Sequence, residues 1–123
     1  MIKLGDFGLA AQLEHDCAKP NTTCRSSVFM APEAYDTGTC LKSDVWSLGI
    51  SVIEMAEGKN PFGGMTSAMI VNQVLNKPPP SLNSSDWSSD LVDFVKRCLV
   101  KEVEKRSSVD DLLKVSIEMS YDE

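Results

Sequence analysis

The chain has 123 residues, of which 42% are hydrophobic and 24% are charged, a composition typical of a globular domain or part of one and unlike that of disordered or fibrous proteins. The formal net charge of -6 and the absence of any lysine and arginine cluster exclude nucleic acid as an expected partner. No apolar run approaches the ~20 residues of a membrane-spanning helix, and Met1 to Asp6 do not resemble a signal peptide, so we expect a cytoplasmic protein without a membrane partner.

Cysteine and histidine residues form no recognisable metal site or disulfide framework. The cysteines include no Cys-x-x-Cys pair, and no His and Cys set has zinc spacing. The single histidine, His15, lies in a polar stretch where no motif places a carboxylate or nucleophile beside it, so we expect no catalytic role for it. Reduced thiols are expected at Cys17, Cys24, Cys40 and Cys98.

Residues 1–42 contain few signals of regular structure. Only Ile2-Lys3-Leu4 alternates apolar and polar side chains, which predicts a short strand. The stretch 14–28 is rich in Pro, Asn, Thr and Ser and is typical of a loop. A loop of about 15 residues within a compact domain usually either has a function or is disordered.

Residues 43–57 carry the strongest helix signal. We expect Ser43 to cap the first turn, Asp44 to lie at the positive end of the helix dipole, and Gly58 to end the helix. Apolar residues on most sides predict a buried helix. They form two stripes, one of Val45, Leu48, Val52 and Ala56 and the other of Trp46, Ile50 and Ile53.

Three amphipathic helices are predicted further along, at 66–76, 89–99 and 109–118, facing a common core. Ser88 is placed to cap the second, and Ser108 with Asp111 forms the pattern of a capping box before the third. The Pro- and Ser-rich residues 78–89 predict a long loop. The expected inward residues are Ile70, Val71, Val74 and Leu75, then Leu91, Phe94, Val95, Cys98 and Leu99, then Val109, Leu112, Leu113 and Ile117.

Several short motifs follow one another in a meaningful order. Asp6-Phe7-Gly8 alone would suit an ordinary turn, but Ala31-Pro32-Glu33, the helix opening at Asp44, Arg97-Cys98-Leu99-Val100-Lys101 and Lys105-Arg106-Ser107 accompany it. Together they resemble the C-terminal lobe of a eukaryotic-type protein kinase domain over essentially the whole chain. Ile2-Lys3-Leu4-Gly5, Ala11-Gln12-Leu13 and Phe29-Met30 resemble the STE group of serine/threonine kinases, which act in MAP-kinase cascades.

This resemblance implies a mainly α fold in which C-terminal helices surround a buried central helix, with a short N-terminal strand and no N-lobe. Residues 1–123 would form a partial kinase domain. Its parts would be a metal-binding loop at 1–8, the activation segment at 9–33, the buried central helix at 43–57 and the C-terminal helices at 66–118.

By resemblance, three adjacent residues belong to the nucleotide site. Asp6 is expected to bind Mg²⁺, which prefers oxygen ligands and bridges the phosphates of ATP. Phe7 is expected to pack inward and so set the direction of Asp6, and Gly8 to permit the turn that follows. Read without the resemblance, Phe7 is an apolar anchor beside a turn.

The activation segment contains the expected regulatory and substrate-facing positions. Thr22 or Thr23 lies where STE-group kinases carry a phosphosite, although either could equally be a solvated loop residue. Ser26 falls at the hydroxyl position that faces the protein substrate. The family usually has glycine and proline where this chain has Arg25 and Ser27, which puts the shape of the substrate-binding loop in question.

Two further acidic residues have structural interpretations. Glu33 and Arg106 match an ion pair of the family, which we expect to be buried; two solvated charges would contribute only about 0–1 kcal/mol. Asp44 matches the aspartate that holds the catalytic-loop backbone in the family, and this role is compatible with its place at a helix N-terminus. Ser107 departs from the proline that commonly follows the arginine.

The chain lacks other residues that kinase catalysis requires. It has no Gly-rich loop, no phosphate-binding lysine and no His-Arg-Asp catalytic base. We therefore expect a fragment of a protein serine/threonine kinase, a family that uses ATP and Mg²⁺ to phosphorylate protein substrates, including the kinases of a cascade. We expect the 123 residues alone to be inactive. The alternatives are a non-catalytic C-lobe that binds another kinase or a cascade protein through residues 66–76, and an incomplete gene product.

Overall fold

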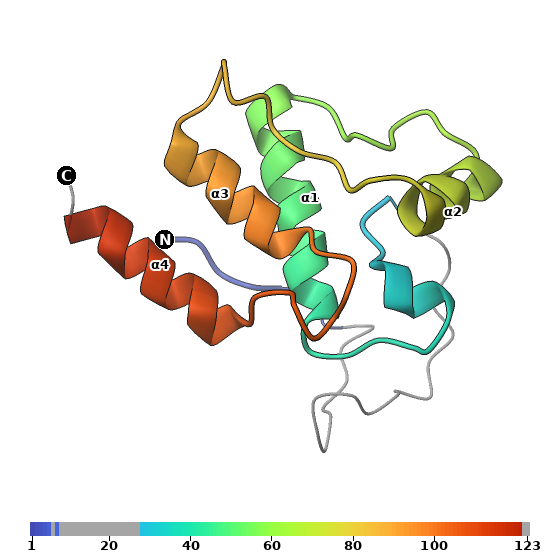
Figure 1. The fold of residues 1–123 in the computed structure, drawn as a ribbon, viewed down its shortest axis with the longest axis horizontal. Coiled ribbons are helices and arrows are strands. Elements are labelled where there is room, and N and C mark those ends of the chain that lie inside the picture. Colours follow the sequence, from blue (N-terminus) through green and yellow to red (C-terminus); the bar gives the residue numbers. More distant parts are fainter. Residues whose placement is uncertain (6, 8–27, 122–123) are drawn as a thin grey trace.

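The computed structural model describes residues 1–5, 7 and 28–121, with side chains described up to Val115. In this part of the chain a 3-10 helix, η1 (Pro32–Tyr35), precedes four α-helices. These are α1 (Ser43–Glu57), α2 (Ser67–Asn76), α3 (Ser89–Cys98) and α4 (Val109–Tyr121). In Figure 1, α1 stands at the centre, with α3 and α4 on one side and η1 and α2 on the other. The predicted helices are confirmed, each starting within one residue of its expected position.

Helix α1 provides the centre of the core. Trp46, Ile50 and Ile53 follow one another at helical spacing and are at most 1% exposed. Helix α3 packs against this helix, and Gly49 makes the close approach feasible. A Cβ atom at Gly49 would lie 2.7 Å from Cys98 Cβ, closer than two packed carbons can be.

The helix ends are set by local hydrogen bonds. Ser88 caps α3, because its hydroxyl accepts from the backbone N–H of Leu91 at 3.2 Å. Ser108 and Asp111 form the predicted capping box, with both backbone-to-side-chain bonds at 3.1 Å. Gly58 ends α1 in the left-handed conformation, φ 76°, which glycine adopts without steric cost.

The predicted N-terminal strand is wrong. Residues 1–5 have no regular secondary structure, and no strand occurs among the described residues. Ile2 and Leu4 are 98% and 87% exposed. A strand is stabilised by pairing with a neighbour and by burying one face, and the described part of the chain provides neither for this segment.

Some predicted inward positions are also wrong. Helix α4 packs on α3 around Leu112, which is 4% exposed, whereas Val109 and Leu113 are more than half exposed. Leu48 of α1 and Leu75 of α2 are exposed as well. Periodicity gives the direction of an apolar face but not the width of the neighbour that covers it, so residues at the margins of each face lie outside the contact.

No helix in the described part of the chain is both long and apolar enough to span a bilayer.

Candidate functional site

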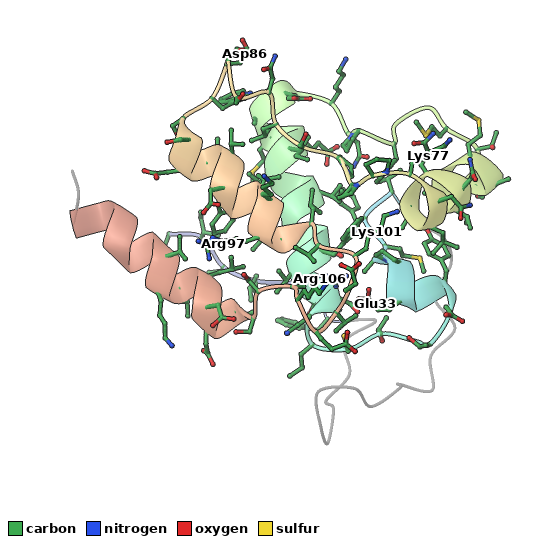
Figure 2. All side chains as sticks on the ribbon, in the orientation of Figure 1. Glu33, Lys77, Asp86, Arg97, Lys101 and Arg106 are labelled. Atoms are coloured by element: carbon green, nitrogen blue, oxygen red, sulfur yellow. The ribbon has the colours of Figure 1, made fainter. Side chains whose placement is uncertain are left out.

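The described part of the candidate site is built around a buried ion pair between η1 and the loop before α4. Arg106 Nη1 lies 2.8 Å from Glu33 Oε2, and Arg106 Nη2 lies 2.9 Å from Glu33 Oε1, so the two planar groups meet through two parallel hydrogen bonds. Arg106 is 1% exposed and Glu33 is 9% exposed. Figure 2 shows the two side chains meeting near the N-terminal end of α1. The structure therefore brings these two residues together as a buried pair.

The guanidinium group of Arg106 has a partner for each of its five N–H groups. Besides the two bonds to the carboxylate, Nε donates to Val100 O at 2.7 Å, Nη1 to Lys42 O at 2.8 Å and Nη2 to Lys101 O at 3.3 Å. The group also lies 5.4 Å from the centre of the Trp46 ring. A single side chain thus joins three segments: η1, the start of α1, and the loop that follows α3.

The carboxylate of Glu33 has a third partner, Ser43. The hydroxyl of Ser43 donates to Glu33 Oε2 at 2.6 Å and accepts from the backbone N–H of Cys40 at 3.0 Å. The prediction that Ser43 caps α1 is therefore wrong: Lys42 occupies the cap position without a side-chain bond, and Ser43 is a buried residue of the first turn. A serine at the start of a helix has the same sequence pattern whether it caps the helix or bonds to a distant side chain, so only the three-dimensional contact distinguishes the two roles.

These contacts keep Glu33 ionised. Burial by itself would raise the pKa of the carboxyl group, but the hydrogen bonds from Arg106 and Ser43, together with the charge of Arg106, lower it below its ordinary value. A charged carboxylate at this depth is stable only because its oxygens are paired.

A second contact attaches the residues before η1 to α1. The hydroxyl of Ser47 donates to the backbone carbonyl of Phe29 at 2.8 Å. Sequence reasoning did not identify this role for Ser47. A serine inside a helix gives no sequence signal of a bond to a distant main chain, although its place among apolar residues marks it as unusual.

The other predicted site residues are only partly described. Asp6, Gly8, Thr22, Thr23 and Ser26 lie outside the described residues. Their expected roles stay predictions.

Asp44 and Phe7 lie within the described part. Asp44 is exposed in the first turn of α1 and has no hydrogen-bond or ion-pair partner among the described residues, which suits a carboxylate at a helix N-terminus. Phe7 was expected to pack inward, but it is 66% exposed. The inward packing is wrong for this chain, because no apolar surface among the described residues covers the ring.

No group of three or more His, Cys, Asp or Glu residues within the described ranges could hold a metal ion. Asp6 therefore remains the one predicted Mg²⁺ ligand. A carboxylate has the right chemistry for one of the six oxygen positions around Mg²⁺, and the rest would have to come from phosphates, water or other residues.

Comparison with known proteins identifies the class. The family described as the protein kinase domain matches residues 1–117, and the chain belongs to that family. One relative is the serine/threonine-protein kinase hippo of Drosophila melanogaster, 44% identical over 113 residues. The match covers 90% of this chain and 17% of the fly protein, so the chain spans about a sixth of the length of that relative. Hippo is an STE-group kinase, which confirms the predicted group, and the helical architecture agrees with a kinase C-lobe.

Proposed function

We propose that this chain is the C-terminal part of a cytoplasmic serine/threonine kinase domain that transfers the γ-phosphoryl group of ATP to a hydroxyl of a protein substrate. The observation that carries the proposal is the buried Glu33–Arg106 pair. It fixes η1 against the beginning of α1, and in this proposal η1 is the end of the activation segment, on the substrate-binding side of the domain. The similarity to a serine/threonine-protein kinase supports the class of hydroxyl.

In this proposal each site residue has a separate task. Asp6 holds Mg²⁺, which neutralises charge on the phosphates of ATP, and Gly8 permits the backbone turn that follows. Thr22 or Thr23 accepts a regulatory phosphate. Ser26 faces the substrate hydroxyl.

The remaining proposed roles belong to the frame. Glu33 and Arg106 hold the activation segment in place, so that the substrate meets a fixed surface. Asp44 is exposed, and in the complete domain its carboxylate would bind the backbone of the catalytic loop. The catalytic base and the phosphate-binding lysine are not among the 123 residues, so we propose that this chain by itself does not transfer phosphate.

To test the proposal, the catalytic base and the phosphate-binding lysine are provided by the kinase domain of the fly relative. In a chimera, this chain replaces the matching 113 residues of hippo. We expect Mg²⁺-dependent phosphorylation of a generic protein substrate by the chimera, no activity from the 123-residue chain, and no activity from the chimera carrying Asp6→Ala. A folded chimera without activity, or a chimera whose activity survives Asp6→Ala, would refute the proposed function.

A second candidate function is supported by the surface of α2. This helix contains no charged residue, and Met69 and Leu75 are 51% and 41% exposed on it. A neutral helix with exposed apolar side chains is suited to protein binding, so the chain could act as a non-catalytic module that docks on another kinase.

The residues that test this alternative must lie on the outer surface of α2. Ile70 and Val74 are 6% and 1% exposed, so changing them would test folding. The informative variant is Met69→Glu with Leu75→Glu. If it abolishes binding of the chain to a purified hippo kinase domain in calorimetry, with unchanged unfolding, the docking module is favoured; if the chain shows no binding, the module is refuted.

A further inference from the structure

Two serine hydroxyls of α1 hold the same segment, residues 29–33, against this helix. Ser43 and Ser47 are one helical turn apart, and they donate to Glu33 Oε2 at 2.6 Å and to Phe29 O at 2.8 Å. Their acceptors are likewise four residues apart. The segment 29–33 is therefore held against the first two turns of α1 at both of its ends.

The Ser47 bond differs in kind from the Glu33 attachment. It reaches a main-chain carbonyl, so it fixes the path of the backbone whatever side chain residue 29 carries. It also has an alternative, because Ser43 O of the same helix lies 3.3 Å from the Ser47 hydroxyl. When Phe29 moves away, the hydroxyl retains an acceptor within its own helix. The contact can thus open and close without stranding a buried donor.

The position of this contact gives it a consequence for substrate binding. Phe29 lies three residues after Ser26, the proposed substrate-facing residue, and Ser27 has no proline ring to fix the backbone between them. A hydrogen bond to the Phe29 carbonyl therefore fixes the main chain three positions from the proposed substrate-facing residue. The Glu33 attachment is four residues further along the chain.

We infer that Ser47 is a positioning residue for the protein substrate: by holding the Phe29 carbonyl, it keeps the substrate-facing part of the activation segment in its binding geometry. This inference rests on the proposed kinase function. It assigns to Ser47 no contact with substrate or nucleotide.

The competing explanation is that the Ser47 hydroxyl matters only through its bond to a carbonyl of its own helix. Ser51 is an example of such a bond, since it lies one turn further along α1 and its hydroxyl donates to Ser47 O at 2.9 Å. Both serines are half-buried residues of one helix. Ser51→Ala is therefore a matched control for Ser47→Ala.

The first measurement uses the 123-residue chain. Hydrogen–deuterium exchange of peptides covering residues 28–34, in which the Ala34 amide donates to Ala31 O, should be about fivefold faster in Ser47→Ala than in wild type, because the loss of one hydrogen bond makes local opening of this segment easier by that factor. Ser51→Ala and Ser47→Thr, which keeps a hydroxyl, should exchange like wild type. Equal exchange in Ser47→Ala and Ser51→Ala would overturn the inference.

The second measurement uses the chimera with the fly kinase. Ser47→Ala should raise KM for the protein substrate about fivefold, leave KM for ATP unchanged and change kcat by less than about twofold, because one hydrogen bond that positions the substrate is lost. Ser47→Thr should restore KM. An active chimera whose protein KM is unaffected by Ser47→Ala would overturn this inference alone, whereas an inactive wild-type chimera would overturn the proposed function and the inference with it.

Discussion

Replacement of Arg106 by methionine tests the buried pair most directly, because it keeps much of the side-chain volume and removes every donor. The variant would lose both bonds to Glu33 and those to the carbonyls of Val100, Lys42 and Lys101. The carboxylate of Glu33, a residue 9% exposed in the wild-type fold, would keep Ser43 as its remaining hydroxyl partner.

Breaking a buried ion pair by removing one partner costs about 3–5 kcal/mol, because the other charge is left uncompensated. Five donated bonds at about 1 kcal/mol each give a similar figure. Since whole domains are stable by about 5–15 kcal/mol, we expect Arg106→Met to lose a large share of the free energy of unfolding. Urea unfolding followed by tryptophan fluorescence is a suitable assay, because Trp46 lies directly beneath the guanidinium group.

Arg97→Met is the matched control for this measurement. Arg97 pairs with Asp93 at 2.7 Å on the surface of α3, where the two side chains are 47% and 49% exposed. Such a pair contributes about 0.3–0.5 kcal/mol. If Arg106→Met cost no more than Arg97→Met, the buried pair would not stabilise the fold and the reasoning would be refuted. Should Arg106→Met not fold at all, Arg106→Lys, which keeps the charge but loses the planar fork, should give a measurable intermediate loss.

Three further predictions concern the same region. The folded-state pKa of Glu33 is lowered, so its contribution to stability is fully present above the ordinary carboxyl pKa of about 4.3. That contribution is lost as the pH falls through the folded-state pKa. Between pH 7 and pH 3, the urea concentration at half-unfolding should therefore fall more steeply for wild type than for Glu33→Gln. Gly49→Ala should lower the free energy of unfolding by about 1–2 kcal/mol, because the added Cβ would lie 2.7 Å from Cys98 Cβ and 2.9 Å from Leu99 atoms. Helix propensity alone would favour alanine over glycine. A rise in the free energy of unfolding would therefore contradict the packing argument. Burial raises the pKa of the Cys98 thiol to about 11, so at pH 8 about one molecule in a thousand carries the thiolate at this position. Iodoacetamide should therefore label the half-buried Cys40 first and Cys98 only after unfolding in urea. Peptide mass spectrometry would measure the order of labelling. Equal labelling rates in the folded chain would contradict that prediction.

Local signals predicted the helices well, and contacts between distant residues were the harder part. The caps at Ser88 and Ser108 use partners three residues away, so sequence alone can identify them. Glu33 and Arg106 are 73 residues apart, and their pairing was expected through resemblance to a family, since no periodicity connects them. The same limit explains Ser43, whose hydroxyl was assigned to its own helix but bonds to Glu33.

The contacts along α1 divide this chain into parts of different stability. Helix α1 packs against α3, and its residues Ile50 and Ile53 are buried in the core, whereas the polar attachments of residues 29–33 lie at the beginning of the helix. Arg106 belongs to both parts, because it binds Glu33 and also lies over Trp46 in the core. Its loss should therefore lower the stability of the whole fold, while loss of the Ser47 hydroxyl should loosen only the segment around residue 29. Local opening that leaves the core intact is what the proposed function as a regulated substrate-binding segment would require.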